Sequence, residues 1–180
     1  IHGTDRFQYQ YISDAYPGYV KYEREKLRIY TIDIEVTAEQ GFPNVNQAVE
    51  EMICITVKDH NTKNILVWGL VDFQVKQKNV HYVKCTGEKD LLIKFLKFWS
   101  KYPPDIITGW NSKYFDLPYL VNRMKKIIGE SATKRLSPWN IIDEDTAYVR
   151  GKSQTFFRLL GIAQLDYLQL YTKFTIKMQE

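Results

Sequence analysis

Residues 27–37 read LRIYTIDIEVT, and this stretch decides the fold. Its β-branched and aromatic side chains favour an extended strand. Asp33 and Glu35 interrupt the apolar run at a spacing of two. Because residues i and i+2 of a strand point to the same face of a sheet, two carboxylates are expected to project side by side from one surface.

The paired carboxylates have two interpretations. Like charges at this spacing repel each other, and burying either one is costly unless a positive charge compensates it. A divalent cation is a common solution, because hard cations such as Mg²⁺ prefer carboxylate oxygens. The alternative is a solvated polar face on an edge strand, and this stretch alone leaves both interpretations open.

The composition is that of an ordinary globular domain. The 180 residues are 44% hydrophobic and 26% charged, which is enough for one sizeable core. No apolar run reaches the ~20 residues that span a bilayer, and residues 1–18 lack an export signal, so we expect a cytoplasmic protein without a membrane partner. Cys54 and Cys85 are expected to be reduced thiols. The net charge of +4 permits a nucleic-acid partner without requiring one.

Strand and helix patterns alternate along the chain. Besides residues 27–37, strands are expected at 51–60, 65–70, 80–85 and 105–108, and helices at 87–102, 116–128 and 166–174. The first three strands are joined by short polar connections, which favours an antiparallel meander. Together these patterns imply an α/β fold with a mixed five-stranded sheet and helices packed on its faces.

Two segments stand outside this alternation. Residues 1–26 are polar and tyrosine-rich without a sustained hydrophobic period, and we expect them to be the last part of a preceding domain. Residues 139–162 are first acidic and then aromatic and β-branched, with a turn at 148–153 that predicts an inserted β-hairpin. The main domain is therefore assigned to residues 27–180.

A second cluster, GWNSKYFD at residues 109–116, lies where an expected strand is followed by an expected helix. Ligands bind at the carboxyl ends of parallel strands in open α/β sheets. Asp116 can therefore approach Asp33 and Glu35 if the two strands are neighbours. An isolated Asp at a helix start is also a common N-cap, so its position alone does not separate the two roles.

The two clusters together resemble a known family. A D-x-E pair on a strand, followed at residues 111–116 by N-x-x-x-F-D, is similar to the first two exonuclease motifs of family B DNA polymerases. The likeness to the replicative polymerases of T-even-type bacteriophages extends further, to GTDRFQYQYISDAYP, YTIDIEVT, TGWNSKYFDLPYLVNRMKKIIGESATKRLSP and LDYLQLYTKF. It covers nearly the whole chain in matching order.

The resemblance implies a ribonuclease H-like proofreading domain that removes mispaired nucleotides from the 3′ end of single-stranded DNA. Asp33 and Glu35 match the carboxylates of the first motif, and Asp116 matches that of the second. These three side chains are the expected catalytic and metal-binding residues, with two Mg²⁺ or Mn²⁺ ions in the intact parent enzyme. Two ions of this kind clamp the scissile phosphate during hydrolysis.

The resemblance also implies contacts with the substrate. Phe42 matches an aromatic side chain that wedges against bases of the frayed strand, Asn111 matches the asparagine of the second motif, and Phe115 stands beside that motif's carboxylate. The hairpin at 139–162 is similar to one that helps to separate primer from template. The expected partners are the 3′ end of the primer strand and the remaining polymerase domains, in the cytoplasm of a phage-infected host.

The family's third motif, Tyr-x-x-x-Asp, does not occur among these 180 residues. Asp166 follows Ile162 at that spacing and matches instead the start of the helix upstream of the motif. We therefore expect an exonuclease domain truncated before its fourth carboxylate, without a polymerase active site, in which metal ions bind weakly and hydrolysis is slow or absent.

Two alternatives stay open. A freestanding exoribonuclease of the same carboxylate class also uses D-x-E, but it needs a third motif of its own. A non-catalytic module could bind single strands through basic and aromatic residues such as Lys113, Tyr114, Arg123 and Lys125. We interpret Arg123, Lys125 and Lys126 of the second expected helix as the solvated face opposite its apolar stripe.

Overall fold

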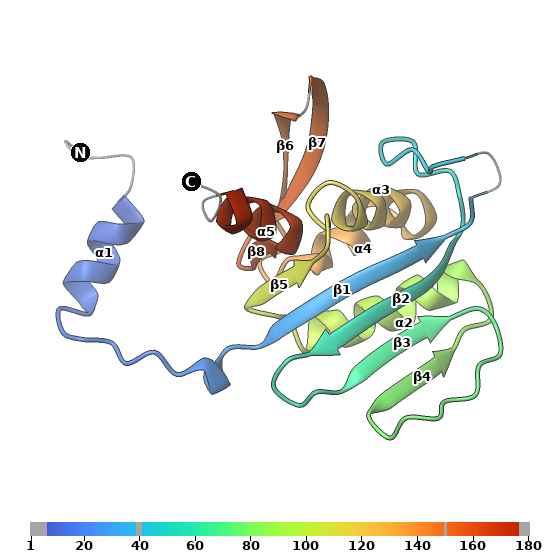
Figure 1. The fold of residues 1–180 in the computed structure, drawn as a ribbon, viewed down its shortest axis with the longest axis horizontal. Helices are drawn as coiled ribbons and strands as arrows, with labels where there is room; N and C mark the ends of the chain where they lie inside the picture. The colour runs from blue at the N-terminus through green and yellow to red at the C-terminus, as the bar shows by residue number, and fades with distance from the viewer. Residues whose placement is uncertain (1–6, 39–40, 150, 177–180) are drawn as a thin grey trace.

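A computed structural model describes residues 7–38, 41–149 and 151–176. Its centre is a six-stranded sheet (Figure 1). The strands, in chain order, are β1 (Ile29–Val36), β2 (Met52–Asp59), β3 (Ile65–Gly69), β4 (Val80–Lys84), β5 (Ile106–Gly109) and β8 (Ala163–Asp166). They lie side by side in the order β4-β3-β2-β1-β5-β8. Within this sheet β2 runs antiparallel to its two neighbours, and all other neighbouring pairs are parallel.

The predicted α/β class and the antiparallel meander of β1, β2 and β3 are confirmed. The sheet has one strand more than the five predicted, because residues 163–166 pair parallel with β5. The sequence pattern placed Asp166 at the start of a helix, but α5 (Tyr167–Ile176) begins one residue later. This strand is only four residues long, and it buries Asp166 while Leu165 is 44% exposed, the reverse of the usual apolar pattern, so it is not recognised in the sequence.

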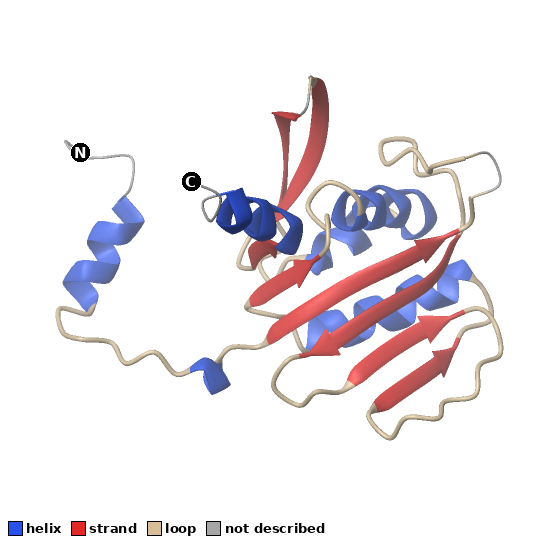
Figure 2. Cartoon of the chain, in the orientation of Figure 1, coloured by secondary structure: helices blue, strands red, loops and turns tan. Residues whose placement is uncertain are grey.

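Two helices pack against the sheet on one side, α2 (Glu88–Lys101) and α3 (Asp116–Ile128), close to the ranges predicted (Figure 2). Each buries an apolar stripe at helical spacing. The buried apolar residues are Leu91, Leu92, Phe95, Leu96 and Trp99 in α2, and Leu117, Pro118, Tyr119, Leu120, Val121 and Met124 in α3. Burying one such side chain contributes about 1.5–3 kcal/mol, so these stripes are the main force that holds the helices on the sheet.

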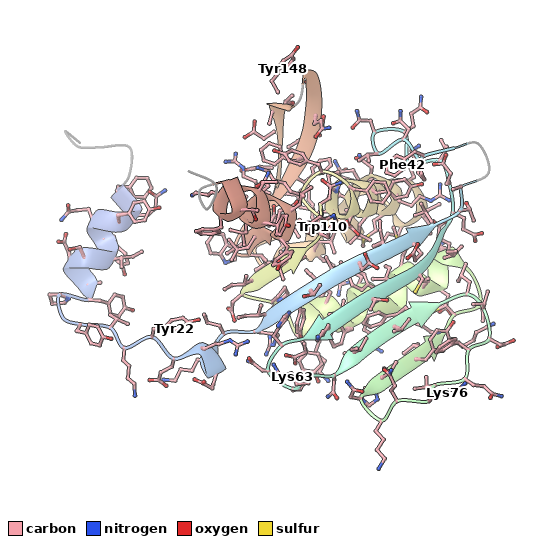
Figure 3. All side chains as sticks on the ribbon, in the orientation of Figure 1. Tyr22, Phe42, Lys63, Lys76, Trp110 and Tyr148 are labelled. Carbon is pink, nitrogen blue, oxygen red and sulfur yellow. The ribbon has the colours of Figure 1, made fainter. Side chains whose placement is uncertain are left out.

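The chain leaves α3 through two short helices, α4 (Glu130–Thr133) and η2 (Lys134–Leu136). The predicted hairpin follows as β6 (Ile142–Val149) and β7 (Lys152–Leu159), which pair with each other in a separate two-stranded sheet. Arg150, predicted in its turn, lies outside the described residues. The hairpin projects away from the six-stranded sheet, with Tyr148 at its far end (Figure 3).

The described part of the amino-terminal segment, residues 7–26, contributes no strand to the sheet. It contains α1 (Phe7–Ala15), which has no buried residue, and a single turn, η1 (Arg24–Lys26). In Figure 1 α1 lies apart from the sheet at the end of an extended connection. Residues 1–6 and 177–180, which belong to the two predicted domain ranges, lie outside the described residues. Among the residues that are described, no helix is both long and apolar enough to cross a membrane.

Gly109 at the end of β5 offers a test of this packing. A Cβ atom added there would lie 2.8 Å from the Ile32 carbonyl oxygen and 2.8 Å from the Ser112 Cβ. We expect Gly109→Ala to lower the free energy of unfolding by about 1–3 kcal/mol, the usual cost of overpacking. Urea denaturation measures the change. Gly18→Ala, where a Cβ meets nothing within 4 Å, is the control, and equal stability of the two variants would contradict the prediction.

Candidate active site

Alternation along β1 presents the two sequence-predicted carboxylates on one face. Ile32 and Ile34 are buried, with 1% and 5% of their surface exposed, whereas Asp33 and Glu35 are exposed. Asp33 lies opposite Thr56 and Glu35 opposite Cys54 on the antiparallel neighbour β2. The apolar side of β1 therefore faces the core, and its acidic side faces solvent.

Asp116 is brought to β1 by the start of α3. Only 5% of this residue is exposed, and its Oδ1 accepts a hydrogen bond of 3.2 Å from the Ile34 backbone N–H. Burial, and then the negative charge of Asp33, raise the pKa of the Asp116 carboxyl to about 7, against the lowering effect of the Ile34 N–H. Asp166 raises it further. The ionised form of Asp116 is therefore disfavoured in this site, because burial and the charge of Asp33 both oppose it.

The turn between β5 and α3 is held by a residue that the sequence patterns did not single out for the site. Asp166, 4% exposed, accepts hydrogen bonds from the backbone N–H groups of Asn111 (3.1 Å) and Lys113 (3.0 Å). The predicted capping of the last helix is also present, because the Leu168 N–H donates to Asp166 Oδ1 (2.8 Å). The only sequence signal at this position was an Asp at the expected start of the last helix.

Asn111 itself adopts a left-handed backbone conformation, with a φ of 59°. Its carbonyl oxygen accepts hydrogen bonds from the backbone N–H groups of Tyr114 (3.1 Å) and Phe115 (3.0 Å). Asparagine tolerates this conformation better than most residues. The turn therefore has a defined shape, and it delivers Asp116 to the first position of α3.

A cavity of about 710 Å³ unites most of the predicted site residues. Asp33, Asp116, Asn111, Phe115 and Phe42 all line it. Phe42 is 84% exposed, and its ring lies 5.1 Å from the ring of Phe115, centroid to centroid. Acidic groups and an exposed aromatic ring thus open into the same space.

Trp110, which also lines this cavity, belongs to a second aromatic group. Trp110 is 57% exposed, and its ring lies 5.8 Å from that of Tyr167 and 5.9 Å from that of Tyr171, both on α5. Figure 3 labels Trp110 and Phe42 at two separate places on the ribbon. Nothing in the sequence pattern marks Trp110, because its partners lie more than fifty residues further along the chain.

Glu35 does not line the cavity of Asp33 and Asp116. It borders a different, mainly apolar hollow of about 640 Å³ over β2, β3 and β4. Among the described residues, no three His, Cys, Asp or Glu side chains are gathered closely enough to hold a metal ion. The structure brings together two of the three predicted metal ligands, and the ligand set as a whole stays a prediction.

Comparison with known proteins identifies the family. Residues 6–178 match the family described as DNA polymerase family B, exonuclease domain. The chain belongs to this family. The resemblance inferred from the two acidic motifs is thereby confirmed, and the six-stranded sheet with flanking helices is the architecture of this exonuclease domain.

Several polymerases are similar to the chain over most of its length. It is 34% identical to the DNA-directed DNA polymerase of Escherichia phage RB69 over 98% of the chain, and 32% identical to that of Enterobacteria phage T4 over 96%. The DNA polymerase of Pyrococcus glycovorans is 31% identical over 57% of the chain. The chain spans 22% of the length of each phage relative and 12% of the length of the Pyrococcus glycovorans polymerase.

The raised pKa of Asp116 predicts how the stability of the metal-free exonuclease domain depends on pH. The carboxyl titrates at about 7 in the folded domain, against an ordinary value of 3.8. Between these values the folded state binds the proton more tightly than the unfolded chain, so the free energy of unfolding falls as pH rises. Asp116→Asn should remove this decline and be more stable than the wild type at neutral pH.

Urea titrations in EDTA from about pH 4 to about pH 7, the range set by the two pKa values, measure this difference. Asp72→Asn is the control, because the Asp72 side chain is 97% exposed. If Asp116→Asn and the wild type lose stability in parallel across this range, the assignment of the titration to Asp116 is wrong.

Substitution of Asp166 tests whether its hydrogen bonds stabilise the turn between β5 and α3. In Asp166→Asn one carboxylate oxygen is replaced by an NH₂ group, which cannot accept a hydrogen bond and faces a backbone N–H. We expect a loss of about 1–3 kcal/mol in the free energy of unfolding, the usual cost of an unsatisfied buried group. Asp72→Asn should change stability by less than about 0.5 kcal/mol. Equal stabilities of the two variants in thermal and urea denaturation would contradict this role.

Proposed function

We propose that this exonuclease domain removes nucleotides from the 3′ end of single-stranded DNA by metal-assisted hydrolysis, and so proofreads for a DNA polymerase. The observation that carries the proposal is the position of Asp116. Its buried carboxyl group is bonded to the Ile34 N–H beside Asp33, in a cavity that also exposes the ring of Phe42. A place for a cation and a surface for a base therefore lie in one space.

The donor set fits a hard divalent cation. Asp33 and Asp116 offer carboxylate oxygens, which Mg²⁺ and Mn²⁺ prefer. The positive charge of a cation would stabilise the ionised form of Asp116, which burial and repulsion by Asp33 disfavour. We propose that Asp33, Glu35 and Asp116 hold the ion or ions. When bound, such ions activate the attacking water and stabilise the leaving 3′ oxygen. Because only two of these carboxylates share the cavity, we expect weak binding.

The aromatic and amide side chains of the cavity would orient the strand. Stacking of a base on an exposed ring is worth about 1–3 kcal/mol and tolerates every base, as a proofreader requires. Phe42 is the ring we assign to this contact, with the tilted ring of Phe115 packed against it at 5.1 Å. Asn111, which lines the same cavity, would donate its amide hydrogens to the terminal nucleotide.

The wider context of the parent protein is also a proposal. The β6–β7 hairpin presents Tyr148, which is 80% exposed, at its far end, and we propose that it helps to separate primer from template. The remaining polymerase domains would be the partners of this chain, and the cytoplasm of the infected host cell its location. Residues 7–26, with no buried side chain in α1, would belong to the preceding domain.

A non-catalytic single-strand binder is the second candidate. It is favoured by the aromatic group of Trp110, Tyr167 and Tyr171, and by the lack of a three-ligand metal cluster among the residues that the structure describes. Such a module needs exposed rings and positive charge but no cation. Metal binding therefore separates the two candidates.

Titration with Mn²⁺ tests the proposed function. We expect weak, saturable heat in calorimetry and a raised melting temperature in the wild type, both lost in Asp33→Asn because one ligand becomes neutral. Asp72→Asn should behave as the wild type. A 5′-labelled DNA oligomer should be shortened slowly from its 3′ end in the presence of Mn²⁺.

Three outcomes would change the assignment. If Mn²⁺ gives neither heat nor stabilisation, the single-strand binder is the better description. If RNA is shortened faster than DNA, the chain is an exoribonuclease of the same carboxylate class. Rapid Mg²⁺-dependent degradation that is lost in Asp33→Ala would show that these residues already contain the fourth ligand.

A further inference from the structure

The loop that carries Phe42 is fastened to α3 through its own backbone. Five carbonyl groups of residues 45–50 accept hydrogen bonds from α3 side chains. The pairs are Val45 with Asn122 (3.1 Å), Gln47 with Lys126, Ala48 and Val49 with Arg123 (3.1 and 2.8 Å), and Glu50 with the Tyr119 hydroxyl (2.8 Å). The four donors are spaced at i, i+3, i+4 and i+7, so they form one stripe along the helix. We name these four residues the α3 clamp.

Arg123 is the centre of the α3 clamp. Its Nε and Nη2 donate to the two carboxylate oxygens of Glu88 at 2.6 and 2.7 Å, and Glu88 also accepts the Met52 backbone N–H at 2.8 Å. The two side chains are only 12% and 8% exposed. Glu88 thereby fixes the plane of the guanidinium group, and Nη1 points at the loop. Lysine cannot reproduce this, because its ammonium group lacks the planar fork.

The α3 clamp holds a backbone that would not keep this shape unaided. Ala48 is fully buried and has a φ of 38°, in the left-handed region that a residue with a Cβ rarely adopts. Such a conformation persists only where the surrounding contacts impose it. Within the loop, Asn44 accepts hydrogen bonds from the backbone N–H groups of Ala48 (2.7 Å) and Gln47 (2.9 Å).

The same helix also carries the predicted catalytic carboxylate. Asp116 is the first residue of α3, and Phe115 just before it packs on Phe42 at 5.1 Å and on Tyr119 at 5.9 Å. One rigid element therefore determines where the exposed ring and the buried carboxyl group lie relative to each other. The α3 clamp positions the loop that carries the Phe42 ring, and the start of α3 positions the Asp116 carboxyl group.

We infer that Arg123 is a positioning residue for the 3′ end of the substrate: it holds the Phe42 loop so that the ring meets a terminal base while Asp116 faces the adjoining phosphodiester. This inference rests on the proposed function. Arg123 acts through the loop, since it is not among the residues that line the cavity of Asp33 and Phe42.

The test uses Arg123→Lys, which keeps a positive charge beside Glu88 and so avoids stranding a buried carboxylate. Affinity is measured in Ca²⁺ for a single-stranded DNA oligomer and for the same oligomer with abasic residues at its 3′ end. Phe42→Ala should weaken binding of the normal oligomer about tenfold, the size of one base–aromatic stack. Arg123→Lys should weaken it by a similar factor and leave binding of the abasic oligomer unchanged.

A double-mutant cycle and two controls complete the test. Phe42→Ala combined with Arg123→Lys should bind no more weakly than Phe42→Ala alone, because both changes remove the same contact. Lys125→Arg, on the same helix but outside the α3 clamp, should bind as the wild type. Asn122→Ala with Tyr119→Phe loosens the loop without disturbing the buried ion pair, and it should reproduce the effect if Arg123→Lys fails to fold.

The outcomes distinguish this inference from the proposed function. If Phe42→Ala binds as tightly as the wild type, the proposed base contact is wrong and the positioning role falls with it. If Phe42→Ala weakens binding but neither loosened variant does, only the positioning role is overturned. Equal weakening for normal and abasic oligomers, or effects that multiply in the double mutant, would reduce Arg123 to a general structural residue.

Discussion

The parallel pairing of β1 with β5 determines where an acidic site can form. Thr31 and Thr108 are the last paired residues of the two strands before β5 ends at Gly109. The chain then turns through the Asp166-held loop and begins α3 at Asp116, whose carboxyl group reaches the Ile34 N–H. The end of one strand and the middle of its neighbour thus meet at one point, the usual place for a ligand in an open α/β sheet.

Two buried acidic side chains at this point have different hydrogen-bond partners. Asp166 accepts hydrogen bonds from three backbone N–H groups, which fix its position. Asp116 has fewer donors and faces the charge of Asp33, which together with burial raises its pKa. The first arrangement stabilises the turn. The second leaves a carboxyl group whose ionised form needs a partner, and perturbed groups of this kind are common at functional sites.

Strongly periodic elements could be predicted from the sequence, and long-range polar contacts could not. The apolar stripes of α2 and α3 fixed their ranges, and the alternation of β1 placed Asp33 and Glu35 on one face. Arg123 was interpreted as solvated, because it lies opposite the apolar stripe of its helix. In the structure its side chain is only 12% exposed, donates hydrogen bonds to the loop at 45–50, and is bonded to Glu88, thirty-five residues away. Neither partner carries a local signal, since the contact exists only after the chain has folded.

The architecture of α3 suggests which part of the site can vary. A helix is stiff, so Asp116 at its start and the Phe42 loop clamped along its side keep a constant relation. The position of α3 relative to β1 is the part that can still change. It is determined by buried residues such as Leu117 and Leu120, together with the hydrogen bond between Asp116 and the Ile34 N–H. Core packing beneath α3 therefore governs the distance between Asp116 and Asp33, although none of those apolar side chains lines the cavity among the described residues. Because a packed core resists small changes in volume, this distance is protected by the same burial that stabilises the fold.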